Sequence, residues 1–172
     1  MTVAALIPQQ IFRKHPMNLE IIVKELPAKR LTGVSVRTNM KNAQVDCPAI
    51  WQNFGPQFGL MASRLCGHES YGVSVMVSED GTFDYWAAVE VVNDAELPEN
   101  VKTFELPGGF YACASVPNLQ QLSPAFGYLY MEWPSQQTEY AVKMPAPCVE
   151  IYGENWQPND PIGVWVPLVR KI

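Results

Sequence analysis

The sequence predicts an α+β fold in which a unit of strand, strand, helix and hairpin occurs twice, giving an antiparallel sheet with two helices and a central groove. The first observation is an internal repeat: Glu25-Leu26-Pro27 recurs as Glu105-Leu106-Pro107, and Ser35-Val36 recurs as Ser115-Val116, each 80 positions later. The second is that each half has one segment of helical periodicity among short strands rich in β-branched residues. A helix over one face of each half leaves a concave groove between the halves, where small molecules commonly bind.

The length of 172 residues fits a single domain. We expect an N-terminal arm over residues 1–18 and one domain over residues 19–172, made of pseudo-repeats 19–92 and 101–169. A repeat of this length far exceeds the periods of solenoid proteins. It therefore indicates a duplication within one domain, with the two halves related by an approximate two-fold axis.

The first half is predicted to begin with strands over residues 19–26 and 31–36. Both segments are rich in β-branched residues. Two further strands, over residues 71–77 and 85–92, flank the segment Ser78-Glu79-Asp80-Gly81. This segment is typical of a hairpin turn, so the half closes with a hairpin.

The helix of the first half is predicted to begin at Cys47-Pro48, because Asp46 can cap it and proline is tolerated in the first turn. Gly55-Pro56 should kink or break this helix. Its apolar stripe falls at helical spacing on Ile50, Phe54, Phe58, Met61 and Leu65.

The helix of the second half is predicted to have Ser123 as its cap and Pro124 as its first residue, and to end at Pro134. Its apolar stripe consists of Leu122, Phe126, Leu129, Tyr130 and Trp133. The half closes with strands over residues 148–152 and 163–168, joined by a long turn-rich connector.

Charge and composition exclude several classes of protein. The net charge is −5 and no block of Lys or Arg occurs, which disfavours direct DNA binding and anionic membranes and favours cationic partners. No apolar run approaches the roughly 20 residues of a membrane span, and the N-terminus lacks the basic start of a signal peptide, so we expect a cytoplasmic protein. The four cysteines lack paired spacing, and no phosphate loop, zinc signature or Ser-His-Asp pattern occurs. We therefore expect no cofactor and no metal.

Glu150 is the principal candidate for a binding residue. It lies in the middle of the otherwise apolar segment Cys148-Val149-Glu150-Ile151-Tyr152. Because side chains alternate along a strand, Glu150 either faces water or is the one charge in an apolar pocket. A carboxylate in such a pocket is costly unless it is paired, and a cationic ligand would be the missing partner. The residues alone leave both alternatives open.

Aromatic side chains and a second carboxylate are candidates for the walls of the same pocket. A cation over an indole face gains about 0.5–2 kcal/mol, although each aromatic could equally belong to the core. Glu90 interrupts its apolar strand as Glu150 does, so it is either a second acidic wall or an outward-facing residue. The loop residue Trp156 is either a lid or exposed. The wall candidates are Trp51, Trp86, Trp165 and Glu90, with Tyr71, Tyr85 and Tyr152 as weaker candidates.

Three segments, together with the duplicated order of elements over roughly residues 19–170, resemble the GyrI-like family. They are Ile50-Trp51-Gln52-Asn53-Phe54, Val149-Glu150-Ile151-Tyr152-Gly153 and Val164-Trp165-Val166-Pro167-Leu168. This family is also the effector-binding domain of AraC-type and multidrug-responsive transcription regulators. The resemblance implies an antiparallel sheet with two helices and a central pocket for cationic, aromatic or lipophilic molecules.

The resemblance also implies roles for three residues. In drug-binding members a buried glutamate faces the ligand, and by position it corresponds to Glu150; an aromatic on the last strand corresponds to Trp165, and the aromatic of the first helix to Trp51. Only 18 residues precede the domain, too few for the helix-turn-helix of the regulators. We therefore expect a stand-alone domain, similar to drug-binding proteins carried on mobile gene cassettes.

We favour a binding module for cationic, lipophilic or aromatic small molecules. Two alternatives stay open. One is an interaction protein that inhibits gyrase or serves a transcription regulator supplied as a separate chain. The other is a hydrolase of cyclopropane-bearing toxins, in which Glu150 would be the general base. Binding and hydrolysis need the same pocket, so the sequence does not separate them.

Overall fold

The structure is a computed structural model that describes residues 18–92 and 96–172. The predicted arm over residues 1–18 lies outside the described residues except for Asn18. In the first half the elements are β1 (Ile22–Leu26), β2 (Lys29–Thr38), α1 (Ala43–Met61), η3 (Ala62–Arg64), β3 (Leu65–Met76) and β4 (Phe83–Val91). In the second half they are β5 (Lys102–Leu106), β6 (Gly109–Val116), η4 (Leu119–Gln121), α2 (Leu122–Met131), η5 (Trp133–Ser135), β7 (Tyr140–Val142), β8 (Cys148–Tyr152) and β9 (Ile162–Arg170).

The described strands form one antiparallel sheet in the order β1-β6-β9-β8-β3-β4-β2-β5, with β7 paired to β9. This order reads the same from either end when the halves are exchanged, because β1 corresponds to β5, β2 to β6, β3 to β8 and β4 to β9. Each half also gives its first strand to the other, since β1 pairs with β6 and β5 pairs with β2. The predicted α+β fold with a duplicated unit is confirmed; the superposition of 19–92 on 101–169 stays a prediction.

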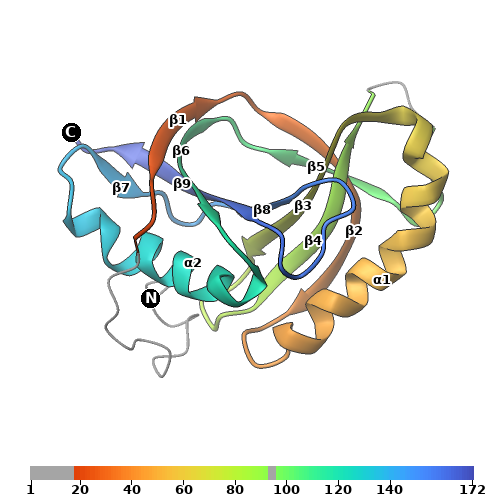
Figure 1. Ribbon diagram of the computed structural model, residues 1–172, viewed down its shortest axis with the longest axis horizontal. Coiled ribbons are helices and arrows are strands. Elements are labelled where there is room, and N and C mark those ends of the chain that lie inside the picture. The colour runs from red at the N-terminus through yellow and green to blue at the C-terminus, as the bar shows by residue number, and fades with distance from the viewer. Residues whose placement is uncertain (1–17, 93–95) are drawn as a thin grey trace.

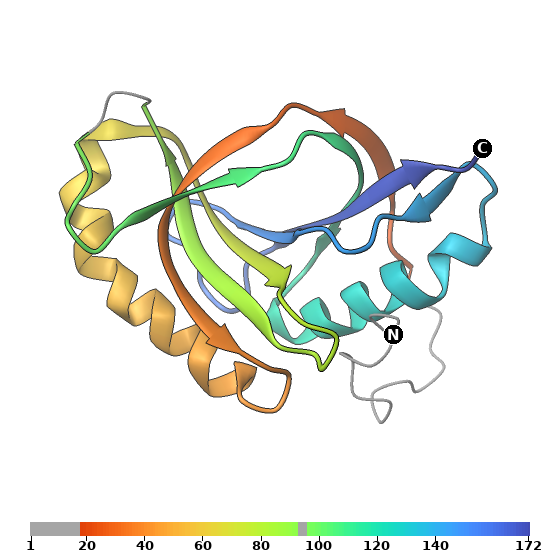
Figure 2. The ribbon, with the colours of Figure 1, turned by 180° about the vertical axis from the view of Figure 1, so that it is seen from behind.

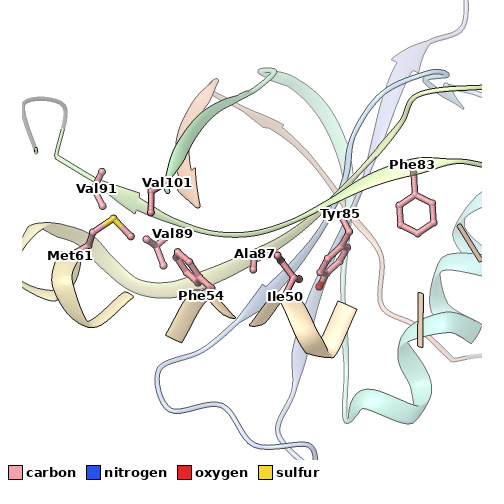
Figure 3. Close-up of a cluster of buried hydrophobic side chains, with 9 residues drawn as sticks. All are labelled: Ile50, Phe54, Met61, Phe83, Tyr85, Ala87, Val89, Val91 and Val101. Carbon is pink, nitrogen blue, oxygen red and sulfur yellow. The ribbon is translucent and has the colours of Figure 1, made fainter. Parts of the chain in front are cut away.

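The two helices cover the same face of the curled sheet (Figure 1 and Figure 2). Helix α1 packs on β2 and β4, and α2 packs on β6 and β9. Alternation along β4 explains the first contact, because its side chains at 83, 85, 87, 89 and 91 are buried and point to one face. Figure 3 shows these side chains facing Ile50, Phe54 and Met61 of α1. We call this side of the sheet the helix face.

The opposite face of the sheet has a core of its own. Its buried residues are Leu31, Tyr71, Val73, Ala88, Leu106 and Val149. They come from five different strands, and the curl of the sheet brings them together. Strand β8 contributes Val149 to this core and Tyr152 to the core of the helix face, so it is covered on both faces and a charged residue within it is conspicuous.

The predicted start of the first helix is wrong, and the helix is not broken at Gly55-Pro56. Helix α1 begins at Ala43, not at Cys47-Pro48, and Asp46 lies in its first turn, where its Oδ2 accepts a hydrogen bond from Thr38 Oγ1 at 2.6 Å. The helix also continues through Pro56 to Met61. Both Gly55 and Pro56 are exposed, so water can satisfy the carbonyl group that proline leaves unpaired. Phe54 and Met61, 1% and 0% exposed, hold the helix to the sheet on both sides of this point.

The second helix and several strands also differ from their predicted bounds. Helix α2 begins at Leu122, and the capping side chain is that of Asn118, which accepts a hydrogen bond from the Gln121 amide in η4. Helix α2 ends at Met131, and Pro134 lies in η5. Strand β3 starts six residues before the predicted position, with irregular pairing between Leu65 and Ser70, and β7 was not predicted. No helix in the described ranges is long and apolar enough to cross a membrane.

Candidate functional site

Glu150 lies at the centre of the sheet, on the helix face. Strand β8 pairs with β3 on one side and β9 on the other, and Glu150 is directly opposite Gly72 of β3. Val149 packs in the core of the opposite face and Tyr152 packs in a core cluster of the helix face. Glu150 shares the face of Tyr152 because strand side chains alternate. The carboxylate therefore points toward the layer that contains α1 and α2.

Two tyrosine hydroxyls hold one oxygen of this carboxylate. Tyr85 on β4 donates to Glu150 Oε2 at 2.8 Å, and Tyr152 on β8 donates to the same oxygen at 2.6 Å. Trp51 on α1 donates from Nε1 to the Tyr85 hydroxyl at 3.0 Å. The chain of donors thus links α1, the first half of the sheet and the second half, and it fixes the orientation of the carboxylate.

The carboxylate is held without a positive charge. Among the described residues, no Lys, Arg or His lies within ion-pair distance of Glu150, and Oε1 accepts no hydrogen bond from a described residue. Part of the side chain reaches solvent, but the protein surrounds the carboxylate closely. Burial therefore raises the pKa of Glu150, and the hydrogen bonds from Tyr152 and Tyr85 lower it by a smaller amount.

The two donors are protonated at physiological pH. Burial, and then repulsion from the Glu150 carboxylate, raises the pKa of Tyr85 and of Tyr152. Each hydroxyl is a neutral donor, which orients a carboxylate but does not neutralise it. The site is consequently one negative charge in an aromatic surround.

Aromatic rings cover the approach to the carboxylate. The ring of Trp51 meets the ring of Tyr152 edge to face at 5.5 Å between centroids, and Tyr152 meets Trp156 in the same way at 5.0 Å. Trp156 belongs to the loop over residues 153–161, which lies between α1 and α2 in Figure 1. Trp156 is half-buried rather than exposed, and its Nε1 donates to the Asp160 carbonyl oxygen at 3.2 Å.

Two thiols complete the surround. Burial, followed by repulsion from Glu150, raises the pKa of Cys47 and of Cys148 to about 12 in each case. Both are therefore neutral thiols at physiological pH and act as small apolar groups rather than nucleophiles. The described residues contain no group of three or more His, Cys, Asp or Glu side chains placed to hold a metal ion.

The other predicted wall residues lie on the opposite face of the sheet. The ring of Tyr71 meets that of Trp165, with 6.4 Å between centroids, and Trp86 meets Phe104 at 5.4 Å. Glu90 accepts a hydrogen bond from the Lys29 ammonium group. That ammonium also lies 5.7 Å from the centre of the Tyr71 ring. The structure thus brings Trp51 to Glu150 and separates Tyr71, Trp86, Glu90 and Trp165 from it by the thickness of the sheet.

Sequence reasoning missed several residues of this site. From the sequence, Tyr85 and Tyr152 are only weaker wall candidates, Gly72 is not singled out, and Cys47 and Cys148 are expected to bind no metal and have no role in the site. No local pattern indicates that Tyr85 and Glu150 meet, because their contact depends on β3 lying between β4 and β8. The one available signal was the alternation of strand β4, which assigns Tyr85 to the helix face once α1 is known to cover that face.

A comparison with protein families shows to which family the chain belongs. The model of the Cass2 family, integron-associated effector binding proteins, matches residues 22–168. The chain belongs to this family. In this effector-binding protein the matched region spans all of the sheet strands, β1 through most of β9, and so contains Glu150 and both of its tyrosine donors. A comparison with curated proteins gives no significant match.

Solved structures share the fold of this effector-binding protein. A structure of the protein SAV2435 bound to tetraphenylphosphonium matches with a TM-score of 0.68 and 19% identity, covering 87% of this chain and 94% of that one. The integron cassette protein VCH_CASS2 from Vibrio cholerae matches with a TM-score of 0.60 and 17% identity over 88% and 99% of the two chains. A protein of Staphylococcus aureus MU50 matches with a TM-score of 0.64 and 19% identity over 87% and 98%. At these identities the likeness establishes the fold.

Proposed function

We propose that this effector-binding protein binds a lipophilic, aromatic monocation between α1 and α2, with Glu150 as the counter-ion. The observation that carries the proposal is that the enclosed Glu150 carboxylate is oriented by Tyr85 and Tyr152 but is paired with no cation among the described residues. An enclosed charge without a partner costs free energy, and a bound cation would remove that cost.

The free oxygen of the carboxylate gives the ligand a place to bind. Oε2 already accepts two hydrogen bonds, whereas Oε1 accepts none from the described residues. A cation near Oε1 would be attracted at short range in surroundings of low polarity, where charges interact more strongly than in water. The tyrosine donors hold the carboxylate in position before the ligand arrives, which reduces the ordering cost of binding.

The surround favours an aromatic or lipophilic ligand over a hydrated metal ion. The indole of Trp51 and the rings of Tyr152 and Trp156 offer faces and edges to a ligand, and a cation over an indole gains about 0.5–2 kcal/mol. The nearby thiols of Cys47 and Cys148 are neutral. A single carboxylate with no further acidic ligands is a poor site for Ca²⁺ or Mg²⁺, which require several oxygens.

Binding requires aromatic side chains to move. The rings of Trp51, Tyr152 and Trp156 pack edge to face over the carboxylate. A cavity of about 20 Å³ exists elsewhere, lined by the turn between β5 and β6 and by Pro147, but it is the size of one water molecule and does not include Glu150. We infer that the loop over residues 153–161, which carries Trp156, shifts to admit a ligand.

The related SAV2435 structure supplies the probe. Its ligand, tetraphenylphosphonium, is a lipophilic monocation, and triphenylphosphine oxide is a neutral molecule with similar aromatic bulk. Isothermal titration of the protein with both should show that the cation binds at least about tenfold more tightly, since an unscreened ion pair contributes well over 1.4 kcal/mol. Equal affinities, or no binding of either, would contradict the proposed function.

A further inference from the structure

Gly72 and Glu150 occupy corresponding positions in the two halves of the molecule. Gly72 of β3 pairs with Ala87 of β4, and Glu150 of β8 pairs with Val164 of β9. Gly72 and Glu150 also pair with each other across the β3–β8 boundary. The approximate two-fold axis of the sheet therefore passes between these two residues, one of which has a charged side chain and the other none.

The absence of a side chain at residue 72 is what makes room for the carboxylate. A Cβ atom on Gly72 would lie 2.5 Å from Glu150 Oε2 and 2.5 Å from the Tyr85 hydroxyl oxygen. Both distances fall well below the 3.4–4 Å of ordinary contact. Gly72 is buried and its backbone conformation is not one that requires glycine. The constraint on residue 72 is thus steric, and it comes from the atoms of the binding site.

Two other strand glycines show, by comparison, how an added Cβ atom at Gly72 differs in what it would collide with. A Cβ on Gly33 would lie 2.0 Å from the Ala87 carbonyl oxygen, so a side chain there would collide with the backbone of the sheet. A Cβ on Gly163 would lie 3.2 Å from side-chain atoms of Ile151, a contact that small adjustments relieve. At Gly72 the colliding atoms are the ends of two side chains, which can rotate away. A side chain at residue 72 would therefore leave the fold intact and displace the carboxylate.

We infer that Gly72 is a positioning and specificity-determining residue of the site. Its missing side chain lets the Glu150 carboxylate lie under both tyrosine hydroxyls, and this placement produces the discrimination between cations and neutral molecules. The inference rests on the proposed function. It deepens that function by assigning charge selectivity to a residue that itself carries no charge and touches no ligand.

The test is the ratio of affinities for tetraphenylphosphonium and triphenylphosphine oxide in Gly72→Ala. We expect this ratio to fall at least about tenfold, because Oε2 loses two charge-assisted hydrogen bonds and its position. Gly163→Ala is the matched control: it adds the same methyl group to strand β9, which lies beyond β8 in the same sheet, and its ratio should equal that of the unmodified protein. In a Glu150→Gln background, Gly72→Ala should change the ratio little further, since the charge is already absent.

The outcomes separate the inference from the function on which it rests. If the unmodified protein has no preference for the cation, the proposed function fails. If it has the preference and Gly72→Ala retains it, the inference about Gly72 is overturned while the function stands. Thermal unfolding checks the fold of each variant. Should Gly72→Ala unfold, the comparison is repeated in a Tyr85→Phe background, which removes one of the two colliding oxygens, and an unchanged ratio there overturns the inference equally.

Discussion

Glu150 and Glu90 are both carboxylates on inner strands of the same sheet, in the middle of apolar segments, yet their surroundings differ. Glu90 lies on the face without helices and accepts a hydrogen bond from Lys29, whose ammonium group also lies over the Tyr71 ring. Glu150 lies on the helix face and is held by two neutral hydroxyls. Aromatic rings, a carboxylate and a cation are thus already assembled within the chain at Glu90, whereas at Glu150 the cation is missing.

The comparison shows why a charged residue in an apolar strand does not by itself identify a binding site. The chain's own lysine completes the cluster at Glu90, so this cluster needs no ligand to neutralise it. The site at Glu150 has the carboxylate and the aromatic rings but no cation among the described residues. Each prediction below tests this difference between a carboxylate with an internal counter-ion and one without.

The largest expected effect is the loss of cation binding in acid. The cation binds the ionised form of Glu150, and burial places the pKa of this group above its ordinary value. As pH falls through that raised pKa the carboxylate is protonated, and the affinity for tetraphenylphosphonium should drop by about tenfold per pH unit. The affinity for triphenylphosphine oxide should stay level. Titrations of both ligands from neutral pH downward measure this, and parallel curves for the two would show that Glu150 is not the group that titrates.

A smaller effect is expected when the internal counter-ion of Glu90 is removed. Lys29→Met should lower the free energy of unfolding by about 1–2 kcal/mol, between the values typical of exposed and of buried ion pairs, because the two side chains are 24% and 32% exposed. Urea unfolding measures this change. Binding of tetraphenylphosphonium should be unaffected, and a lost affinity would mean that the two faces are coupled.

The same unfolding experiment should give the opposite result for Glu150→Gln without ligand. Because the folded-state pKa of Glu150 is raised, its contribution to stability is fully present below the unfolded-state pKa and is lost as pH rises through the folded-state value. At pH values above the folded-state pKa, the ionised carboxylate therefore opposes folding. Glu150→Gln should leave stability unchanged or increase it, and a clear destabilisation would place a hidden cation beside Glu150.

The smallest expected effect concerns the hydroxyl donors. Tyr85→Phe removes one of the two hydrogen bonds to Oε2 and should weaken tetraphenylphosphonium binding by roughly 3- to 10-fold, in line with about 1 kcal/mol for such a bond. Tyr71→Phe is the matched control on the opposite face. Calorimetric titration of both variants makes the comparison, and equal affinities for the two would remove Tyr85 from the site.

Much of the fold could be predicted from the sequence because short segments of the duplicated unit are still identical in the two halves. The repeated Glu-Leu-Pro and Ser-Val segments align the halves, and alternation along the strand assigned Glu150 to one face before its neighbours were known. The helix ends were harder, since Pro56 lies in an exposed turn that tertiary packing of Phe54 and Met61 keeps helical. The local sequence therefore predicts a helix break at Pro56 that the packing prevents.

The composition of the site could not be predicted in the same way. The aromatic candidates were chosen by residue type, but whether an aromatic reaches Glu150 depends on which face of which strand it occupies. Trp165 lies on β9, the strand next to that of Glu150, and its side chain is still on the other face. Val164 is the residue that pairs with Glu150, and side chains of consecutive strand residues point to opposite faces. Tyr85 reaches Glu150 across β3 only because Gly72 leaves space between them.

The most direct test of the account compares the two carboxylates in one assay. The unmodified protein, Glu150→Gln and Glu90→Gln are each titrated with tetraphenylphosphonium and with triphenylphosphine oxide. Glu150→Gln should lose about 2–5 kcal/mol of binding free energy for the cation, roughly 30- to several-thousand-fold in affinity, and little for the neutral molecule. Glu90→Gln should bind both as the unmodified protein does. An unchanged cation affinity in Glu150→Gln, or equal losses for the two molecules, would contradict the assignment of Glu150 as the counter-ion.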